Sequence, residues 1–217
     1  MKLSVRNSKI KGDLAIPGSK SHTIRALAIA SLAPGVSVIK APLVSEDTIS
    51  CLFAAGALGA WIKRGDDTVW KIHGTGGHLL EPATTLNMGD SGTGTRLFSA
   101  ISSLASFPVK FDGDSSLRKR PMAPLLSALK ALGVKTESAD GCCPCSVQGP
   151  LQGGETEVDG TSSQYLSALL LAAPLAPEDT ILNVPKLNEV PYVEMTLSWL
   201  KKQNVVIKHT KNFTRFH

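Results

Sequence analysis

The chain has 217 residues, of which 42% are hydrophobic and 19% are charged, and its formal net charge is +5 at pH 7. No apolar run reaches the length of about 18 residues that a transmembrane helix requires, and the first residues lack the apolar stretch of a secretory signal. We therefore expect a cytoplasmic protein, while a plastid protein without its transit peptide stays open. The scattered basic residues and the aromatic content of 5% disfavour nucleic acid. The remaining explanations for the positive charge are a small anionic ligand or simply a mildly basic surface.

Three short strand-like segments that end in glycine recur at even intervals. They are residues 14–18, 86–89 and 157–160. Their last residues, Gly18, Gly89 and Gly160, are spaced at intervals of 71 residues. Small or hydroxylated residues that favour helix starts follow each glycine, and apolar residues at helical spacing come next. Each copy therefore predicts a strand followed by a buried helix.

A second helix and two further strands are predicted in each copy. The helices are expected over Glu46–Leu58, Met122–Leu132 and Pro191–Lys202, and glycine or asparagine stands close behind each. The strands are expected over Trp61–Arg64 with Thr68–His73, Val134–Glu137 with Cys145–Gln148, and Val205–Lys208 with Asn212–Phe216. Turns are expected between these strands at Asp66–Asp67, Asp140–Gly141 and Thr210–Lys211.

The repeated unit is thus strand, helix, strand, helix, strand, strand. We predict an α/β fold made of three βαβαββ repeats, about 1–80, 81–150 and 151–217, with helices inside and short sheets outside. One such unit could not bury its own apolar helix faces, so the three should pack together. No linker divides the chain, and we expect residues 1–217 to form a single substrate-binding lobe.

Three of the four cysteines lie within Cys142–Cys145. A structural zinc site needs four ligands, normally two separated pairs, and no second pair or nearby histidine completes this one. We expect a loop or hairpin with reduced thiols, no metal site and no cofactor.

Helix starts carry unpaired N–H groups and a partial positive charge, so three of them together could bind anions. The first start adds Lys20, and Ser21 and Arg25 share one helix face. The alternative is ordinary capping, with Lys20 and Arg25 as solvated surface residues.

The other two starts differ from the first in chemistry. Gly92 removes a side chain where backbone would approach a ligand, and Arg96 stands at the register position of Arg25. The third start offers the neutral hydrogen-bonding side chains Ser162, Ser163 and Gln164.

A separate basic segment is Arg118–Met122. Arg120 precedes a proline that we expect to open a helix, and a guanidinium can grip a carboxylate or phosphate with two parallel bonds. A solvated basic turn is the alternative.

Four segments resemble, in order, those of the 5-enolpyruvylshikimate-3-phosphate synthase (3-phosphoshikimate 1-carboxyvinyltransferase) family. They are Pro17–Ser21 with Arg25, Gly89–Thr93 with Arg96, Lys119–Met122, and Ser162–Gln164. The resemblance implies one lobe, the N-terminal one, of a two-lobed inside-out barrel whose helix starts face a cleft. It also implies transfer of the enolpyruvyl group of phosphoenolpyruvate to the 5-hydroxyl of shikimate 3-phosphate, with release of phosphate.

The resemblance assigns roles to individual residues. Shikimate 3-phosphate would contact Lys20, Ser21, Arg25, Ser162, Ser163 and Gln164. Phosphoenolpyruvate would contact Lys20, Gly92, Arg120 and Gln164. Lys20 would be the catalytic residue of this lobe, because the family's acidic proton-transfer residues belong to the second lobe.

The sequence departs from the family pattern at two places. Glu189–Val190 stands where bacterial members usually carry serine and a basic residue, and an acid is a poor neighbour for a phosphate. Leu97 replaces a common proline. Family members are about twice as long as this chain, so we expect the second lobe to be absent and the chain alone to have negligible turnover.

Three functional hypotheses follow from these observations. The first is the substrate-cradling lobe of the synthase, with a separate second lobe as a partner. The second is a non-catalytic anion-binding module of the same fold. The third is UDP-N-acetylglucosamine enolpyruvyl transferase, whose lysine–asparagine pair at the first helix start is not matched by Lys20–Ser21.

Overall fold

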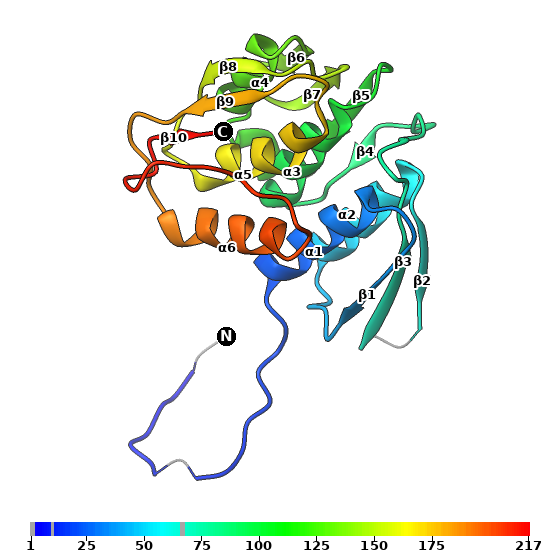
Figure 1. Cartoon of the computed structure of the whole chain (residues 1–217). Helices are drawn as coiled ribbons and strands as arrows, with labels where there is room; N and C mark the ends of the chain where they lie inside the picture. The colour runs from blue at the N-terminus through cyan, green and yellow to red at the C-terminus, as the bar shows by residue number, and fades with distance from the viewer. Residues whose placement is uncertain (1–2, 10, 66–67) are drawn as a thin grey trace.

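The structure is a computed structural model that describes residues 3–9, 11–65 and 68–217 (Figure 1). The turn predicted at Asp66–Asp67 lies outside the described residues. Within the described part of the chain, no helix is long and apolar enough to cross a membrane.

The first part of the chain forms two helices and a three-stranded antiparallel sheet. Its elements are α1 (Lys20–Leu32), β1 (Val36–Lys40), α2 (Glu46–Ala57), β2 (Trp61–Arg64) and β3 (Val69–His73). The strand order is β1-β3-β2. The predicted helix and hairpin of this part are confirmed to within one residue.

The middle part forms a four-stranded mixed sheet and two helices. Its elements are β4 (Leu86–Asn87), α3 (Gly92–Ser102), β5 (Val109–Asp112), a short 3₁₀ helix (Leu117–Lys119), α4 (Ala123–Ala131), β6 (Lys135–Ala139) and β7 (Cys142–Gln148). The order is β4-β5-β7-β6, with β4 parallel to β5. The cysteine-rich segment lies in the β6–β7 hairpin, as predicted, and all four thiols are free.

The last part repeats this plan with a three-stranded sheet. Its elements are β8 (Gly154–Glu157), α5 (Ser163–Ala172), a 3₁₀ turn (Ala173–Leu175), β9 (Thr180–Asn183), α6 (Val190–Lys201) and β10 (Arg215–Phe216). The order is β10-β9-β8, with β8 parallel to β9.

The strand predicted at residues 14–18 is wrong. This segment has no helix or strand assignment, and Leu14 and Ile16 are 81% and 77% exposed. Figure 1 shows the N-terminal stretch leaving the body of the molecule. Alternating apolar residues favour an extended chain, but a strand forms only where an edge is available for pairing.

The strand predicted at Val205–Lys208 is also wrong. Of this segment only Lys208 pairs, exchanging two backbone hydrogen bonds of 2.7 and 2.8 Å with His217. The pairing then continues beyond the segment, through His209 with Phe216 and the N–H of Thr210 with the Arg215 carbonyl, and ends in a tight turn. The Thr210 hydroxyl accepts hydrogen bonds from the N–H groups of Thr214 and Arg215. Because of this turn, the strand predicted over Asn212–Phe216 is shortened to β10 (Arg215–Phe216).

The core consists of helices α1, α3 and α5 surrounded by the sheets. Every residue of α3 except Thr93 is buried. Helix α3 packs on α1, α2 and α5, and α6 packs on α5 and α1. The predicted arrangement, with helices inside and short sheets outside, is confirmed.

Candidate functional site

The start of α1 carries a half-exposed lysine that is paired with a carboxylate of the same chain. Ser19 is the N-cap, and its hydroxyl accepts a hydrogen bond from the N–H of His22. Lys20 Nζ lies 3.1 Å from Asp47 Oδ1 in the first turn of α2, with the lysine side chain 48% exposed. A ligand that binds Lys20 therefore has to share it with Asp47 or displace that carboxylate.

Arg25 is not the solvated surface residue of the alternative hypothesis, because it is only 1% exposed. Its Nε donates to Thr196 Oγ1 at 2.7 Å, and its Nη2 donates to Ser167 Oγ and to the Tyr192 carbonyl. Its Nη1 donates to the carbonyl of Ser21 at 3.2 Å. Burial lowers the pKa of this guanidinium to about 10. Arg25 thus ties α1 to α5 and α6.

The start of α3 brings two guanidiniums against a glycine. A Cβ atom on Gly92 would lie 2.8 Å from Arg120 Nη1 and 3.3 Å from Arg96 Nη1. Two arginine side chains therefore lie beside the bare backbone of Gly92, and the approach of a ligand to it stays a prediction. The resulting concentration of positive charge at a helix start suits an anion.

Arg96 connects this position to α5. Its Nη1 donates to Gln164 Oε1 at 2.5 Å, and its Nη2 donates to the Pro121 carbonyl at 2.8 Å. The guanidinium carbon lies 5.1 Å from the centre of the Tyr165 ring. Burial lowers the pKa of Arg96, and its buried Nε has no hydrogen-bond partner among the described residues.

The basic segment around Arg120 pairs with carboxylates while its arginine side chains stay about half exposed. Arg118 grips Asp112 with bonds of 2.9 and 2.6 Å, and this lowers the pKa of the Asp112 carboxyl. Arg120 pairs with Asp90. The prediction that Pro121 opens a helix is wrong, since α4 begins at Ala123.

The start of α5 holds a carboxylate from another element. Ser162 is the N-cap, and its hydroxyl accepts from the N–H of Gln164. Ser163 is 1% exposed and donates twice to Glu189 Oε2, through its N–H at 3.3 Å and its hydroxyl at 3.0 Å. The acid noted as a departure in the sequence therefore sits directly on a helix start.

The three helix starts are neighbours. Arg25, in the second turn of α1, bonds to Ser167 in the second turn of α5, and Arg96, in the second turn of α3, bonds to Gln164 in the first turn of α5. Helix α1 also packs directly on α3. The structure thus brings Gly92, Arg120 and Gln164 together, and it links Lys20 to them through α2, where Cys51 Sγ lies 3.7 Å from Ser91 Oγ.

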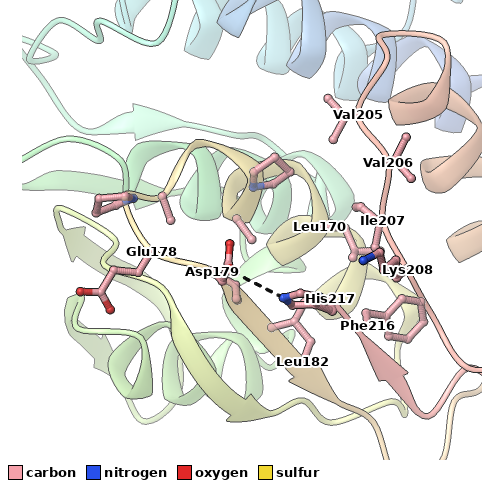
Figure 2. Close-up of a pocket in the computed structure, with 15 residues that line it drawn as sticks. Leu170, Glu178, Asp179, Leu182, Val205, Val206, Ile207, Lys208, Phe216 and His217 are labelled. Atoms are coloured by element: carbon pink, nitrogen blue, oxygen red, sulfur yellow. Dashed lines mark ion pairs between the residues drawn. The ribbon is translucent and has the colours of Figure 1, made fainter.

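A separate pocket lies away from these residues (Figure 2). It is lined by the end of α5, β9 and the C-terminal segment, with Asp179 and His217 facing each other at 3.8 Å. None of the predicted site residues lines it. No group of three or more potential metal ligands occurs among the described residues.

Comparison with known proteins identifies the class first through the fold. Solved structures of EPSP synthase from Acinetobacter baumannii superpose with TM-scores of 0.84 and 0.82 at 30% identity, covering 94% of this chain and 46% of each solved chain. The family model for EPSP synthase (3-phosphoshikimate 1-carboxyvinyltransferase) matches residues 5–217. The chain belongs to this family.

The relatives also define how much of the family is present. The 3-phosphoshikimate 1-carboxyvinyltransferase of Acetivibrio thermocellus is 47% identical over 207 residues, which cover 94% of this chain and 49% of that protein. The protein of the same name from Methanocorpusculum labreanum is 44% identical, with 96% and 50% coverage. The chain spans about half the length of the curated relatives it matches, and it corresponds to their N-terminal half.

Sequence reasoning missed the carboxylates that face the site. Asp47, Asp90 and Glu189 each contact a predicted site residue. Only Glu189 gave a signal, as a departure from the family pattern. Asp47 reads as an ordinary acid in the first turn of a helix, and Asp90 is 30 residues from Arg120.

Proposed function

We propose that this chain forms one side of a cleft that binds phosphoenolpyruvate and shikimate 3-phosphate for enolpyruvyl transfer. The observation that carries the proposal is the pair of guanidiniums, Arg96 and Arg120, that meet at Gly92 beside Gln164. Two cations at a helix start, with a neutral donor next to them, suit the phosphate and carboxylate of a small, multiply charged anion.

Individual contacts extend this proposal. Phosphoenolpyruvate would be held by Lys20, Gly92, Arg120 and Gln164, and shikimate 3-phosphate by Lys20, Ser21, Ser162, Ser163 and Gln164. Arg25 belongs to the second set by resemblance. Since its guanidinium is buried against protein partners, its contribution here would be to hold the main chain of Ser21 in place.

Turnover needs the other side of the cleft. We propose a separate second lobe as the partner that completes it and supplies proton-transfer groups, and the cytoplasm as the location. General acid–base groups typically contribute about 10²- to 10⁴-fold each. The chain alone should therefore bind ligands without measurable catalysis.

The test is a titration of the purified chain with each ligand, alone and with a separately produced second half of a family member. Binding should occur in both cases, and phosphate release only with both halves. Robust turnover by the chain alone would contradict the proposed division of labour. If neither ligand binds, with or without the second half, the proposed binding site is wrong.

Lys20→Met tests the site within the same titration. Lys20 is a half-exposed surface lysine, so folding should be unchanged. Ligand affinity should fall by about 1.5–3 kcal/mol, the usual contribution of a hydrogen bond to a charged group. Lys201→Met, in the last turn of α6, is the matched control and should leave affinity unchanged. Unchanged affinity in Lys20→Met would make Lys20 a surface residue only.

A second candidate function is a non-catalytic anion-binding module of the same fold. The contact of Glu189 with Ser163 favours it, because a carboxylate occupies donors that the transferase would use for phosphate. Tight ligand binding with no catalysis after addition of the second half would support this candidate over the first.

A further inference from the structure

We infer that Glu189 is a built-in competitor that sets the affinity of the α5 helix start for phosphorylated ligands. This inference rests on the proposed function, which gives Ser162 and Ser163 to the phosphate of shikimate 3-phosphate. It adds that the site is already filled by a side chain of this protein and has to be vacated before a ligand can use it.

The contact has the geometry of a bound anion. A single carboxylate oxygen of Glu189 accepts hydrogen bonds from both the N–H and the hydroxyl of Ser163, at 3.3 and 3.0 Å. Ser163 is 1% exposed, so its two donors have few alternatives in solvent. The first turn of α5 carries no acidic residue of its own. Glu189 therefore supplies the negative charge that this helix start favours.

Glu189 is an N-cap residue whose side chain does not cap its own helix. It precedes α6 with φ 54° and ψ 41° and makes no capping bond there. An N-cap side chain normally accepts an N–H of the helix that it opens. Here the carboxylate is directed to the neighbouring helix instead, which leaves the start of α6 without that stabilisation.

The loop before α6 keeps the carboxylate close to α5. The N–H of Asn188 donates to the carbonyl of Gly160 at 2.8 Å. A Cβ on Gly160 would lie 2.0 Å from the Lys186 carbonyl, so the two backbones touch at a point where a side chain has no room. Release of the donors therefore takes a rotation of the Glu189 side chain, after which the charge remains nearby.

A phosphate that replaces this carboxylate meets two opposing effects. The charge-assisted bonds from Ser163 to Glu189 have to break first. The displaced carboxylate, on an exposed residue, then repels the incoming phosphate across a short distance. Both effects lower phosphate affinity, and neither would exist with a short neutral residue at this position.

The experiment measures binding at Ser163 directly. Inorganic phosphate, and separately shikimate 3-phosphate, are titrated into the full chain while the Ser163 amide is followed by NMR. Glu189→Gln removes the charge and keeps the length. Glu189→Asn also shortens the side chain and tolerates the left-handed backbone. We expect about tenfold tighter binding in Glu189→Asn, a smaller gain in Glu189→Gln, and a smaller difference from wild type at high salt.

Two controls separate this inference from general effects. Glu194→Gln removes an exposed acid from the same helix and should leave affinity within about twofold of wild type, since each exposed charge alone contributes little. Adding Ser163→Ala to Glu189→Asn should remove the gain, because the donor hydroxyl is lost.

Equal affinities of wild type and both Glu189 variants would overturn the inference while leaving the proposed anion site in place. The same gain in Glu194→Gln would also overturn it, because net charge would then explain the effect. Absence of any ligand-dependent shift at Ser163 in every variant would overturn both this inference and the use of the α5 start in the proposed function.

Discussion

Arg25 of α1 and Arg96 of α3 stand seven residues after Gly18 and Gly89, so they occupy matching positions, yet they face different surroundings. Arg25 is bonded at all three nitrogens, to Thr196, Ser167 and two carbonyls. Arg96 leaves its Nε unpartnered among the described residues and points its Nη1 toward Gly92.

If the proposed function is correct, the same residue at the same position of a repeated pattern serves the fold in one place and a ligand site in the other. Burial is similar, at 1% and 6% exposure. What separates the two arginines is whether neighbouring helices supply hydroxyls. Helices α5 and α6 supply them to Arg25, whereas Arg96 bonds to an amide oxygen and a carbonyl and otherwise lies beside a glycine, a ring and a second guanidinium.

The largest expected effect is on stability, from Arg25→Met. The variant removes the bonds that join α1 to α5 and α6, although Ser167 and Thr196 still hydrogen-bond to each other at 3.0 Å. We expect a loss of about 2–4 kcal/mol in the free energy of unfolding, measured by denaturant titration. Arg215→Ala, which breaks an exposed pair with Glu155, is the control and should cost under about 1 kcal/mol. If both variants lose the same free energy of unfolding, Arg25 contributes no more to stability than a surface arginine.

The next effect is on ligand affinity, from Gly92→Ala. The new methyl group would lie 2.8 Å from Nη1 of the half-exposed Arg120, whose side chain can move aside, and 3.3 Å from the buried Arg96, which has to shift only slightly, so the stability should change little. Phosphoenolpyruvate affinity should fall by about 1.5–3 kcal/mol because the Arg120 guanidinium leaves its position. Isothermal titration against Gly56→Ala, a helical glycine of α2 whose nearest atom would be 3.8 Å away, provides the control. If Gly92→Ala binds phosphoenolpyruvate like wild type, the ligand does not depend on the Arg120 guanidinium beside Gly92.

The smallest effect concerns pH, at the Arg118–Asp112 pair beside the site. Hydrogen bonds from Arg118 lower the pKa of Asp112, so its ionised form stabilises the folded state. This contribution is present above the unfolded pKa, about 3.9, and is lost as pH falls through the lower folded pKa. Unfolding curves of wild type and Asp112→Asn should therefore differ at neutral pH and converge in acid. A constant difference down to about pH 2 would contradict the assignment.

The helices were predictable because their apolar spacing and capping residues act locally, and α2, α4 and α6 lie within one residue of their expected ends. Residues 14–18 and 205–208 were not, because a strand depends on a partner that the segment itself does not reveal. The site followed the same rule. The absence of a side chain at Gly92 indicated that another group lies close to the backbone there. The pairing of Arg120 with Asp90, in contrast, joins residues that no local sequence pattern connects.

In the proposed site, the carboxylates that contact Lys20, Arg120 and Ser163 would make ligand binding an exchange of one anion for another. Fixed counter-ions, Asp47, Asp90 and Glu189, already neutralise or occupy the groups that would hold a ligand. A ligand of the proposed site would enter by exchange, so it would gain affinity only where its own negative groups match the spacing of those it replaces. Simple monovalent salts, which can displace one counter-ion at a time, should be retained weakly compared with multiply charged metabolites.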